Sequence, residues 1–182
     1  MSANRSNLKL FLSEEKIQSA VADLARRIEA DYRPLTQSGG ELIIVVTLKG
    51  ALFFAADLMR RIEMPVLIDF VRVSSYGSGT KSTGNVVMTK DIENPVPGNH
   101  LLILDESVDS GLTVKFLLEK FKQSEAASVK VCSLLNKPSR REAQVHVDYV
   151  GLDVEDKFLV GYGLDFDEKY RNLKAIYTLE DT

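Results

Sequence analysis

The stretch LLILDESVDSGLT, residues 101–113, joins a run of aliphatic residues directly to three acidic side chains and a turn of small residues. The aliphatic run is typical of a strand that is covered on both faces. The residues from Gly111 onward have the pattern of a helix, so the acidic residues fall where a strand leads into a helix. In an open α/β sheet, ligands bind at such loops, beyond the carboxyl ends of the strands.

Strand and helix patterns alternate on both sides of this stretch. Strands are predicted at 41–50, 65–75, 86–92, 100–107, 127–137, 148–154 and 157–164, and helices at 13–33, 51–62 and 111–124, with a last helical turn near 167–173. A polar, glycine-rich segment at 76–85 is predicted to be a hairpin loop. This alternation is typical of parallel crossover units. The predicted fold class is α/β, with a mostly parallel twisted sheet flanked by helices.

Length and composition limit the possible functions. The chain has 182 residues, of which 45% are hydrophobic, and this predicts one domain. A net charge of −3 with scattered basic residues predicts no nucleic-acid partner. The only cysteine, Cys132, lies in an apolar segment and is interpreted as a core residue. No signal-peptide pattern or membrane-spanning run is found, so the sequence predicts a cytoplasmic protein without a membrane partner.

The turn within the opening stretch has the features of a phosphate site. Backbone N–H groups at the helix start can surround a phosphate, and a glycine permits close approach. These groups belong to Ser110, Gly111, Leu112 and Thr113. The lysine-containing P-loop pattern is absent from the whole chain.

Three acids lie next to this turn, namely Asp105, Glu106 and Asp109. Carboxylates at a strand end can accept hydrogen bonds from a ribose diol or hold a hydrated divalent cation. A phosphate and a diol together indicate a ribose 5-phosphate. The alternative is structural, with Asp105 and Glu106 as solvated strand-end acids and Asp109 as a helix N-cap.

The segment ILDESVDSGLT resembles the phosphoribosyl-diphosphate signature of the purine phosphoribosyltransferases. Four further segments agree with that family in order and spacing, so the resemblance covers roughly residues 8–180. It implies the type I phosphoribosyltransferase fold as a single domain over residues 1–182. It also implies a core at about 35–150, a small hood built from about 1–12 and 151–182, and a mobile loop at about 75–86.

Two of these segments concern the diphosphate and the loop. TLKGALFF resembles the family's diphosphate loop, which implies diphosphate binding by Lys49 and Gly50 and a cis peptide bond between Leu48 and Lys49. SSYGSGTKSTG resembles the mobile loop, with Ser75 and Tyr76 near its start. Without the resemblance, Lys49 is interpreted as an exposed lysine before a helix, and SSYGSGTKSTG as an ordinary hairpin loop.

The other two segments concern the purine. SLLNKP resembles the strand end whose lysine, here Lys137, donates to the 6-oxo group of the base. VEDKFLVGYGLDFDEKYR resembles the hood. It implies that Phe158 stacks on the purine and that the backbone of Leu159 contacts the ring edge. It also implies that Asp165 belongs to the purine site and binds the second Mg²⁺ or its water near the diphosphate, and that Arg171 binds the diphosphate. Taken alone, Lys137 is a surface lysine and Phe158 a core residue. His100 and His146 match no family position and are interpreted as surface or structural histidines.

This sequence departs from the family pattern at the strand end. The family usually has Glu-Asp followed by two aliphatic residues, whereas residues 105–108 read DESV. The acidic pair is exchanged, which moves each carboxylate by about one methylene and bears on ribose and metal binding. Ser107 also replaces an aliphatic residue.

The resemblance implies an enzyme of purine salvage. It implies transfer of the 5-phosphoribosyl group from phosphoribosyl diphosphate to hypoxanthine or guanine through an oxocarbenium-like transition state. Asp109 and Lys137 are the expected catalytic residues, Mg²⁺ held by Asp105, Glu106 and Asp165 is the expected cofactor, and a homodimer or homotetramer is the expected assembly. The alternatives are a non-catalytic nucleotide sensor with this fold and a binding module for another phosphosugar.

Overall fold

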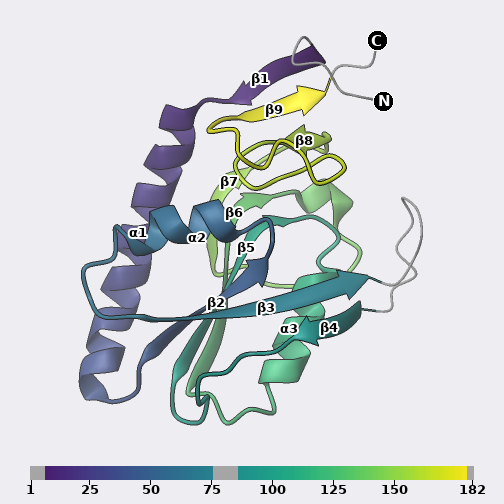
Figure 1. Cartoon of the computed structure of the whole chain (residues 1–182). Helices are drawn as coiled ribbons and strands as arrows, with labels where there is room; N and C mark the ends of the chain where they lie inside the picture. The colour runs from purple at the N-terminus through teal and green to yellow at the C-terminus, as the bar shows by residue number, and fades with distance from the viewer. Residues whose placement is uncertain (1–6, 76–85, 180–182) are drawn as a thin grey trace.

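The computed structural model describes residues 7–75 and 86–179, and its centre is a six-stranded sheet with the strand order β4-β3-β2-β5-β6-β7 (Figure 1). The described elements are β1 (Leu8–Leu12), α1 (Glu14–Ser38), β2 (Leu42–Leu48), α2 (Leu52–Met59), β3 (Leu67–Ser75), β4 (Val86–Lys90), β5 (His100–Val108), α3 (Leu112–Phe121), β6 (Ser128–Asn136), η2 (Pro138–Arg140), β7 (Tyr149–Asp153), β8 (Leu159–Val160) and β9 (Ile176–Leu179). All neighbouring strands of this sheet pair in parallel except β4, which is antiparallel to β3 at one edge. The predicted α/β fold class is confirmed.

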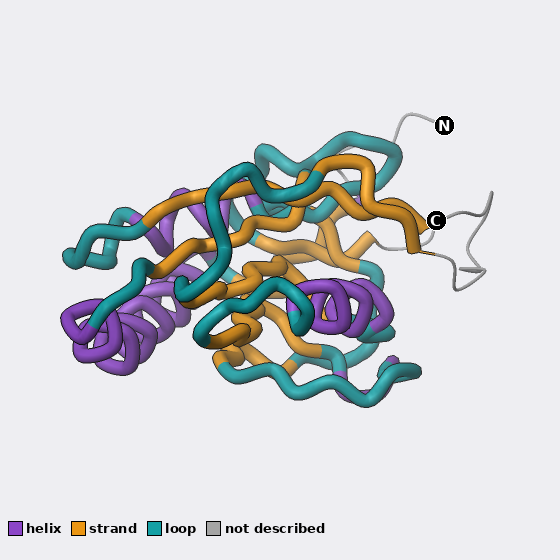
Figure 2. The backbone as a smooth tube through the Cα atoms, turned by 90° about the horizontal axis from the view of Figure 1, so that it is seen from below, coloured by secondary structure: helices purple, strands orange, loops and turns teal. Residues whose placement is uncertain are grey.

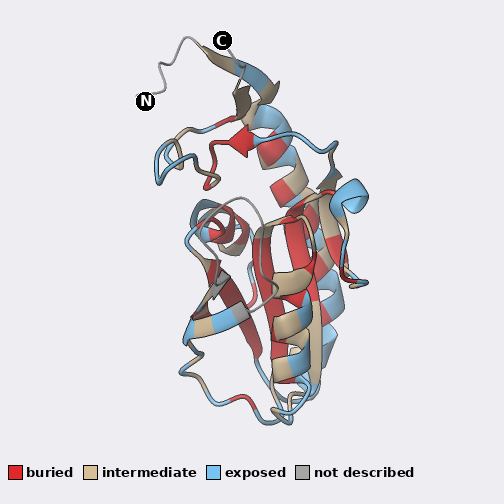
Figure 3. Cartoon of the chain, turned by 90° about the vertical axis from the view of Figure 1, so that its right-hand side faces the viewer, coloured by how far each residue is buried: buried red, intermediate tan, exposed pale blue. Residues whose placement is uncertain are grey.

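The central strands are apolar on both faces because helices cover both sides of the sheet (Figure 2). In β2, Ile44 and Val46 pack into the core under α1 and α2, whereas Ile43 and Val45 pack into the core under α3. Successive side chains of a strand point to opposite faces, so a continuous aliphatic run serves both cores. Figure 3 shows the buried residues concentrated along these strands.

Helix α1 begins where the sequence predicts and ends later. The side chain of Ser13 accepts a hydrogen bond from the backbone N–H of Lys16, as expected for an N-cap. The helix continues through Pro34 to Ser38. The hydroxyls of Thr36 and Ser38 donate to the backbone oxygens of Arg33 and Leu35, which provides partners for groups near the helix end.

The two ends of the chain meet in a second, three-stranded antiparallel sheet with the order β1-β9-β8 (Figure 1). Neither β1 nor β9 was predicted as a strand. The predicted helical turn near 167–173 is wrong, because Asp167, Glu168 and Tyr170 have φ values of +52°, +63° and +73°. Left-handed residues cannot continue a right-handed helix, and here they form tight turns instead.

The cysteine and the two histidines lie as expected. Cys132 is buried in the core under α1, and burial raises the pKa of its thiol, so it is an unreactive core residue. The His100 ring is buried, with its Nδ1 2.8 Å from the Ser128 hydroxyl. His146 is a surface residue. Within residues 7–75 and 86–179, no helix is both long and apolar enough to cross a membrane.

Gly163 fixes how the turns of residues 161–173 lie against the loop after β2. It has a φ of +101°, and a Cβ atom there would lie 1.9 Å from the backbone oxygen of Gly50. We expect Gly163→Ala to lower the free energy of unfolding by about 2–4 kcal/mol, from backbone strain and this clash together. Urea denaturation measures the loss.

Gly98→Ala is the matched control. Gly98 has a φ of +78°, but within the described part of the chain no atom other than those of Gly98 and its two neighbours lies within 4 Å of the position its Cβ would take. This variant therefore has the backbone strain without the clash. Equal losses of stability in the two variants would show that the contact with Gly50 contributes nothing.

Candidate active site

The candidate site lies at the carboxyl ends of β2, β5 and β6, where the sequence placed it. The turn after β5 is held in position by the segment that follows η2. The backbone oxygen of Ser110 accepts hydrogen bonds from the N–H groups of Glu142 and Ala143 at 3.0 and 2.9 Å, and the guanidinium of Arg141 donates to the backbone oxygen of Asp109. The turn is therefore held in place by residues 141–143, which are not part of the predicted phosphate site.

A small pocket of about 100 Å³ lies in this turn. It is lined by Asp105, Ser107, Val108, Asp109, Ser110, Gly111, Thr113 and Val114. Gly111 has a φ of +81°, and a Cβ atom there would lie 2.9 Å from the backbone oxygen of Ala143, so the turn requires glycine. Hydroxyl groups and the start of α3 make this pocket suitable for a phosphate.

In the acidic pair at the end of β5, Asp105 is buried rather than solvated and Glu106 is half-buried. Asp105 is buried, and the Thr47 hydroxyl donates to its Oδ1 at 2.8 Å. Glu106 folds against Gly50, where a Cβ atom would lie 1.7 Å from its Oε1. Burial raises the pKa of Asp105, and burial together with the neighbouring Asp105 charge raises the pKa of Glu106 well above its usual value. A cation or hydroxyl donors would relieve this unfavourable arrangement.

The three predicted metal ligands do not meet in one cluster. Among residues 7–75 and 86–179, no three His, Cys, Asp or Glu side chains are close enough to share a metal ion. Asp165 is instead 2.8 Å from the guanidinium of Arg171. Any divalent cation held by Asp105 and Glu106 therefore needs further ligands from substrate or water.

Lys137 and Asp109 meet although they come from different strands. Lys137 is buried, and its Nζ donates to Asp109 Oδ2 at 3.0 Å and to the backbone oxygen of Lys157 at 3.1 Å. The interpretation of Lys137 as a surface residue is therefore wrong. A fixed ammonium beside a carboxylate can present one donor and one acceptor to the same planar ligand.

Lys49 and Arg171, the two side chains predicted to bind diphosphate, both contact the carboxylate of Glu168. Glu168 receives a hydrogen bond from Lys49 Nζ at 2.7 Å and lies 3.4 Å from the guanidinium of Arg171. The hydrogen bond from Lys49 lowers the pKa of the Glu168 carboxyl. The peptide bond between Leu48 and Lys49 is cis, as predicted. A larger anion can bind to these two cationic side chains in place of the Glu168 carboxylate.

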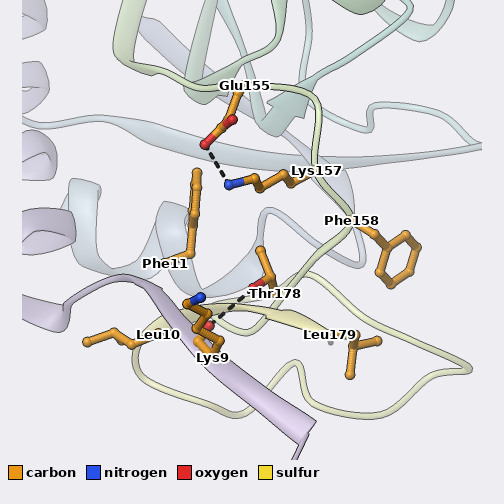
Figure 4. Close-up of a pocket in the computed structure, with 8 residues that line it drawn as sticks. All are labelled: Lys9, Leu10, Phe11, Glu155, Lys157, Phe158, Thr178 and Leu179. Atoms are coloured by element: carbon orange, nitrogen blue, oxygen red, sulfur yellow. Dashed lines mark hydrogen bonds and ion pairs between the residues drawn. The ribbon is translucent and has the colours of Figure 1, made fainter. Parts of the chain in front are cut away.

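Phe158 is exposed rather than buried, with 57% of its surface accessible, so the interpretation as a core residue is wrong. Its ring contacts Phe166 edge to face, with 5.8 Å between the ring centroids. Figure 4 shows Phe158 at the rim of a pocket beside β1 and β9, with its ring turned away from Phe11. It directly follows Lys157, whose carbonyl holds Lys137, whereas Leu159 is buried in β8.

The predicted mobile loop is only partly described. Ser75 is the last residue of β3, and Tyr76 with the rest of 76–85 lies outside the described residues. The predicted loop therefore stays a prediction.

Three residues of the site were not predicted from sequence. Thr47 holds Asp105, Ser107 donates to Asp109, and Glu168 joins Lys49 to Arg171. A polar residue near the end of an otherwise aliphatic strand is the signal that could have identified Thr47. For Ser107 the signal was a hydroxyl in place of an aliphatic residue of the family pattern.

Comparison with known proteins gives a consistent result over almost the whole chain. A family model described as a phosphoribosyl transferase domain matches residues 11–167. The chain is 44% identical to the hypoxanthine-guanine phosphoribosyltransferase of Mycobacterium avium over 94% of this chain and 85% of that protein. It is 43% identical to the enzyme of that name from Aquifex aeolicus over 96% of each. The crystal structure of a hypoxanthine phosphoribosyltransferase from Staphylococcus aureus matches with a TM-score of 0.89 and 39% identity, over 96% of this chain and 93% of that chain.

Proposed function

The chain belongs to the phosphoribosyl transferase family, and from this premise we propose that it is a purine salvage enzyme. It transfers the 5-phosphoribosyl group of phosphoribosyl diphosphate to hypoxanthine or guanine and releases diphosphate. The observation that carries the proposal is the pairing of buried Lys137 with Asp109 beside a phosphate-sized turn. The relatives are named as enzymes of this reaction, and nothing in the comparisons favours a non-catalytic sensor.

The substrate groups fit the residues at the strand ends. The 5-phosphate binds the turn from Ser110 to Thr113, and the ribose hydroxyls bind the acids at the end of β5. Lys49 and Arg171 bind the diphosphate. Lys137 donates to the purine 6-oxo group, and adenine is excluded because its 6-amino group brings hydrogens toward the ammonium. Phe158 supplies an exposed aromatic face for stacking, and the backbone of Leu159 contacts the ring edge.

The reaction proceeds by early departure of the diphosphate. The bond between ribose C1 and the diphosphate oxygen breaks, and its electron pair leaves with the diphosphate. Purine N9 then forms its bond to C1, and the proton on N7 passes to the carboxylate of Asp109. Nearby carboxylates favour the positively charged sugar, while Lys49 and Arg171 stabilise the charge of the departing group.

The donor set at the end of β5 fits Mg²⁺. Mg²⁺ is usually held by one or two carboxylates, with water and substrate phosphates completing its shell. Asp105 and Glu106 supply two carboxylates of this kind, and their buried charges disfavour the doubly ionised pair without a cation. Asp165 is the candidate ligand for a second ion. When bound, Mg²⁺ would further neutralise the charge of the leaving diphosphate.

One assay tests the proposal directly. The protein is incubated with phosphoribosyl diphosphate, Mg²⁺ and hypoxanthine, guanine, xanthine or adenine in turn, and nucleotide formation is followed by chromatography. We expect nucleotide with hypoxanthine or guanine and none with adenine. If no base yields nucleotide, the proposed function is wrong.

Glu168 competes with the diphosphate for its two cations. We expect Glu168→Gln to lower KM for phosphoribosyl diphosphate by about twofold to fourfold, because a neutral amide holds Lys49 and Arg171 less strongly and the ion pair is exposed. Initial-rate kinetics at saturating hypoxanthine measures the change. Glu119→Gln is the control, since Glu119 is as exposed as Glu168 (63%) and its ion pair is with Lys115, on α3. An unchanged or higher KM in Glu168→Gln would contradict the competition.

A dimer or tetramer and a cytoplasmic location stay predictions for this chain. Sedimentation velocity of the purified protein measures the assembly.

A further inference from the structure

Ser107 lies at the end of β5, and its hydroxyl donates a hydrogen bond to the carboxylate of Asp109. We propose that Ser107 is a positioning residue for the transfer reaction, which holds the Asp109 carboxylate where it receives the N7 proton of the purine. The inference rests on the proposed function, because it assigns Ser107 a part in the same reaction. It also gives a role to the one hydroxyl that stands where the family pattern has an aliphatic residue.

The two oxygens of Asp109 are held from two strands. Ser107 Oγ donates to Oδ1 at 2.6 Å, and Lys137 Nζ donates to Oδ2 at 3.0 Å. With one donor on each oxygen, the carboxylate cannot rotate without losing a hydrogen bond. Arg140 is 3.9 Å from Oδ2, which is too far for a hydrogen bond. The orientation of the carboxylate therefore depends on Ser107 and Lys137.

The two hydrogen bonds leave the carboxylate able to act as a base. An ionised carboxylate has about four acceptor positions on its two oxygens, and the two donors occupy about half of them. The Asp109 side chain also keeps 35% of its surface accessible. A purine can therefore approach an oxygen whose direction is already fixed, which lowers the cost of reaching the transition state.

The position of Ser107 at the end of β5 brings its hydroxyl to the turn that carries Asp109. Ser107 and Asp109 both line the small pocket at the start of α3. Ser107 pairs with Leu135 of β6, two residues before the lysine that holds the other oxygen. An alanine at 107 keeps the strand and removes only the donor.

A competing role for Ser107 is direct binding of the substrate phosphate, since it lines the same pocket as Ser110 and Thr113. The two roles differ in their kinetics. A lost phosphate contact weakens substrate binding and raises KM for phosphoribosyl diphosphate. A misplaced base slows the chemical step and lowers kcat while KM stays nearly constant.

The test compares Ser107→Ala and Ser107→Thr with the wild-type enzyme. We expect Ser107→Ala to lower kcat about tenfold with less than about a twofold change in either KM. Ser107→Thr keeps a hydroxyl and should retain kcat within about threefold. Ser124→Ala is the matched control, because Ser124 Oγ also donates at 2.6 Å, but to a backbone oxygen at the end of α3. Its kcat should be unchanged.

A double-mutant cycle gives the decisive result. If Ser107 acts through the carboxylate, Ser107→Ala should change the residual kcat of Asp109→Asn by less than about twofold. An independent tenfold loss in that background, or a raised KM with unchanged kcat, would overturn the proposal. Absence of transfer by the wild-type protein would instead refute the proposed function itself, so the two failures are distinguishable.

Discussion

Asp109→Asn is expected to lower kcat by about two to four orders of magnitude, because an amide of the same shape cannot accept the N7 proton. Binding of phosphoribosyl diphosphate should change little, since the phosphate turn is held by backbone contacts to Glu142 and Ala143. The variant also leaves Lys137 without its anionic partner, which costs about 1–3 kcal/mol of stability. Single-turnover kinetics with hypoxanthine separates the slow chemical step from binding and product release.

Asp153→Asn is the matched control for this substitution. Asp153 ends β7 at the same edge of the sheet, and its carboxylate accepts a 2.7 Å hydrogen bond from the Asn136 side chain. The same chemical change there should leave kcat within about threefold of the wild-type value. A comparable loss in both variants would mean that general destabilisation, rather than proton transfer, explains the effect of Asp109→Asn.

The sequence predicts the central sheet because its strands are continuous aliphatic runs. Residues 41–50 and 100–107 were predicted as strands, and β2 and β5 lie there. The three-stranded sheet β1-β9-β8 could not be predicted in this way. Its strands β1 and β9 are short, and they pair with each other although they lie near opposite ends of the sequence. The turn at 167–173 also escaped prediction. Asp167, Glu168 and Tyr170 have positive φ values there although none of them is a glycine, and no local pattern predicts this.

Part of the candidate site was predictable from the way neighbouring parallel strands end at one edge of a sheet. β5 and β6 are adjacent parallel strands, so Asp109 and Lys137 at their carboxyl ends must lie close together. The pairing of Glu168 with Lys49 was not predictable, because it depends on the conformation of the turns that precede β9. The orientation of the Ser107 hydroxyl was not predictable either, because Ile103 and Val108 both pack in the core under α3 although strict alternation would put them on opposite faces.

Lys137→Met is expected to lower kcat/KM for hypoxanthine by about two to three orders of magnitude. The substitution removes a buried charged donor and leaves an apolar group of similar length facing the 6-oxo oxygen, which then has no partner. Asp109 also loses the hydrogen bond to its Oδ2, so binding of the base and the rate of transfer should both decline. Discrimination against adenine should weaken, because the group that rejects a 6-amino purine is gone.

Lys157→Met is the matched control for Lys137→Met. Lys157 holds Lys137 only through its backbone oxygen, while its own ammonium pairs with Glu155 at 2.7 Å. Replacing its side chain removes a nearby positive charge and keeps the carbonyl that positions Lys137. We therefore expect kcat/KM for hypoxanthine to stay within about threefold, with adenine still rejected. Should Lys157→Met weaken base selectivity as much as Lys137→Met, the general positive field of the site, rather than a hydrogen bond from Lys137, would determine the choice of purine.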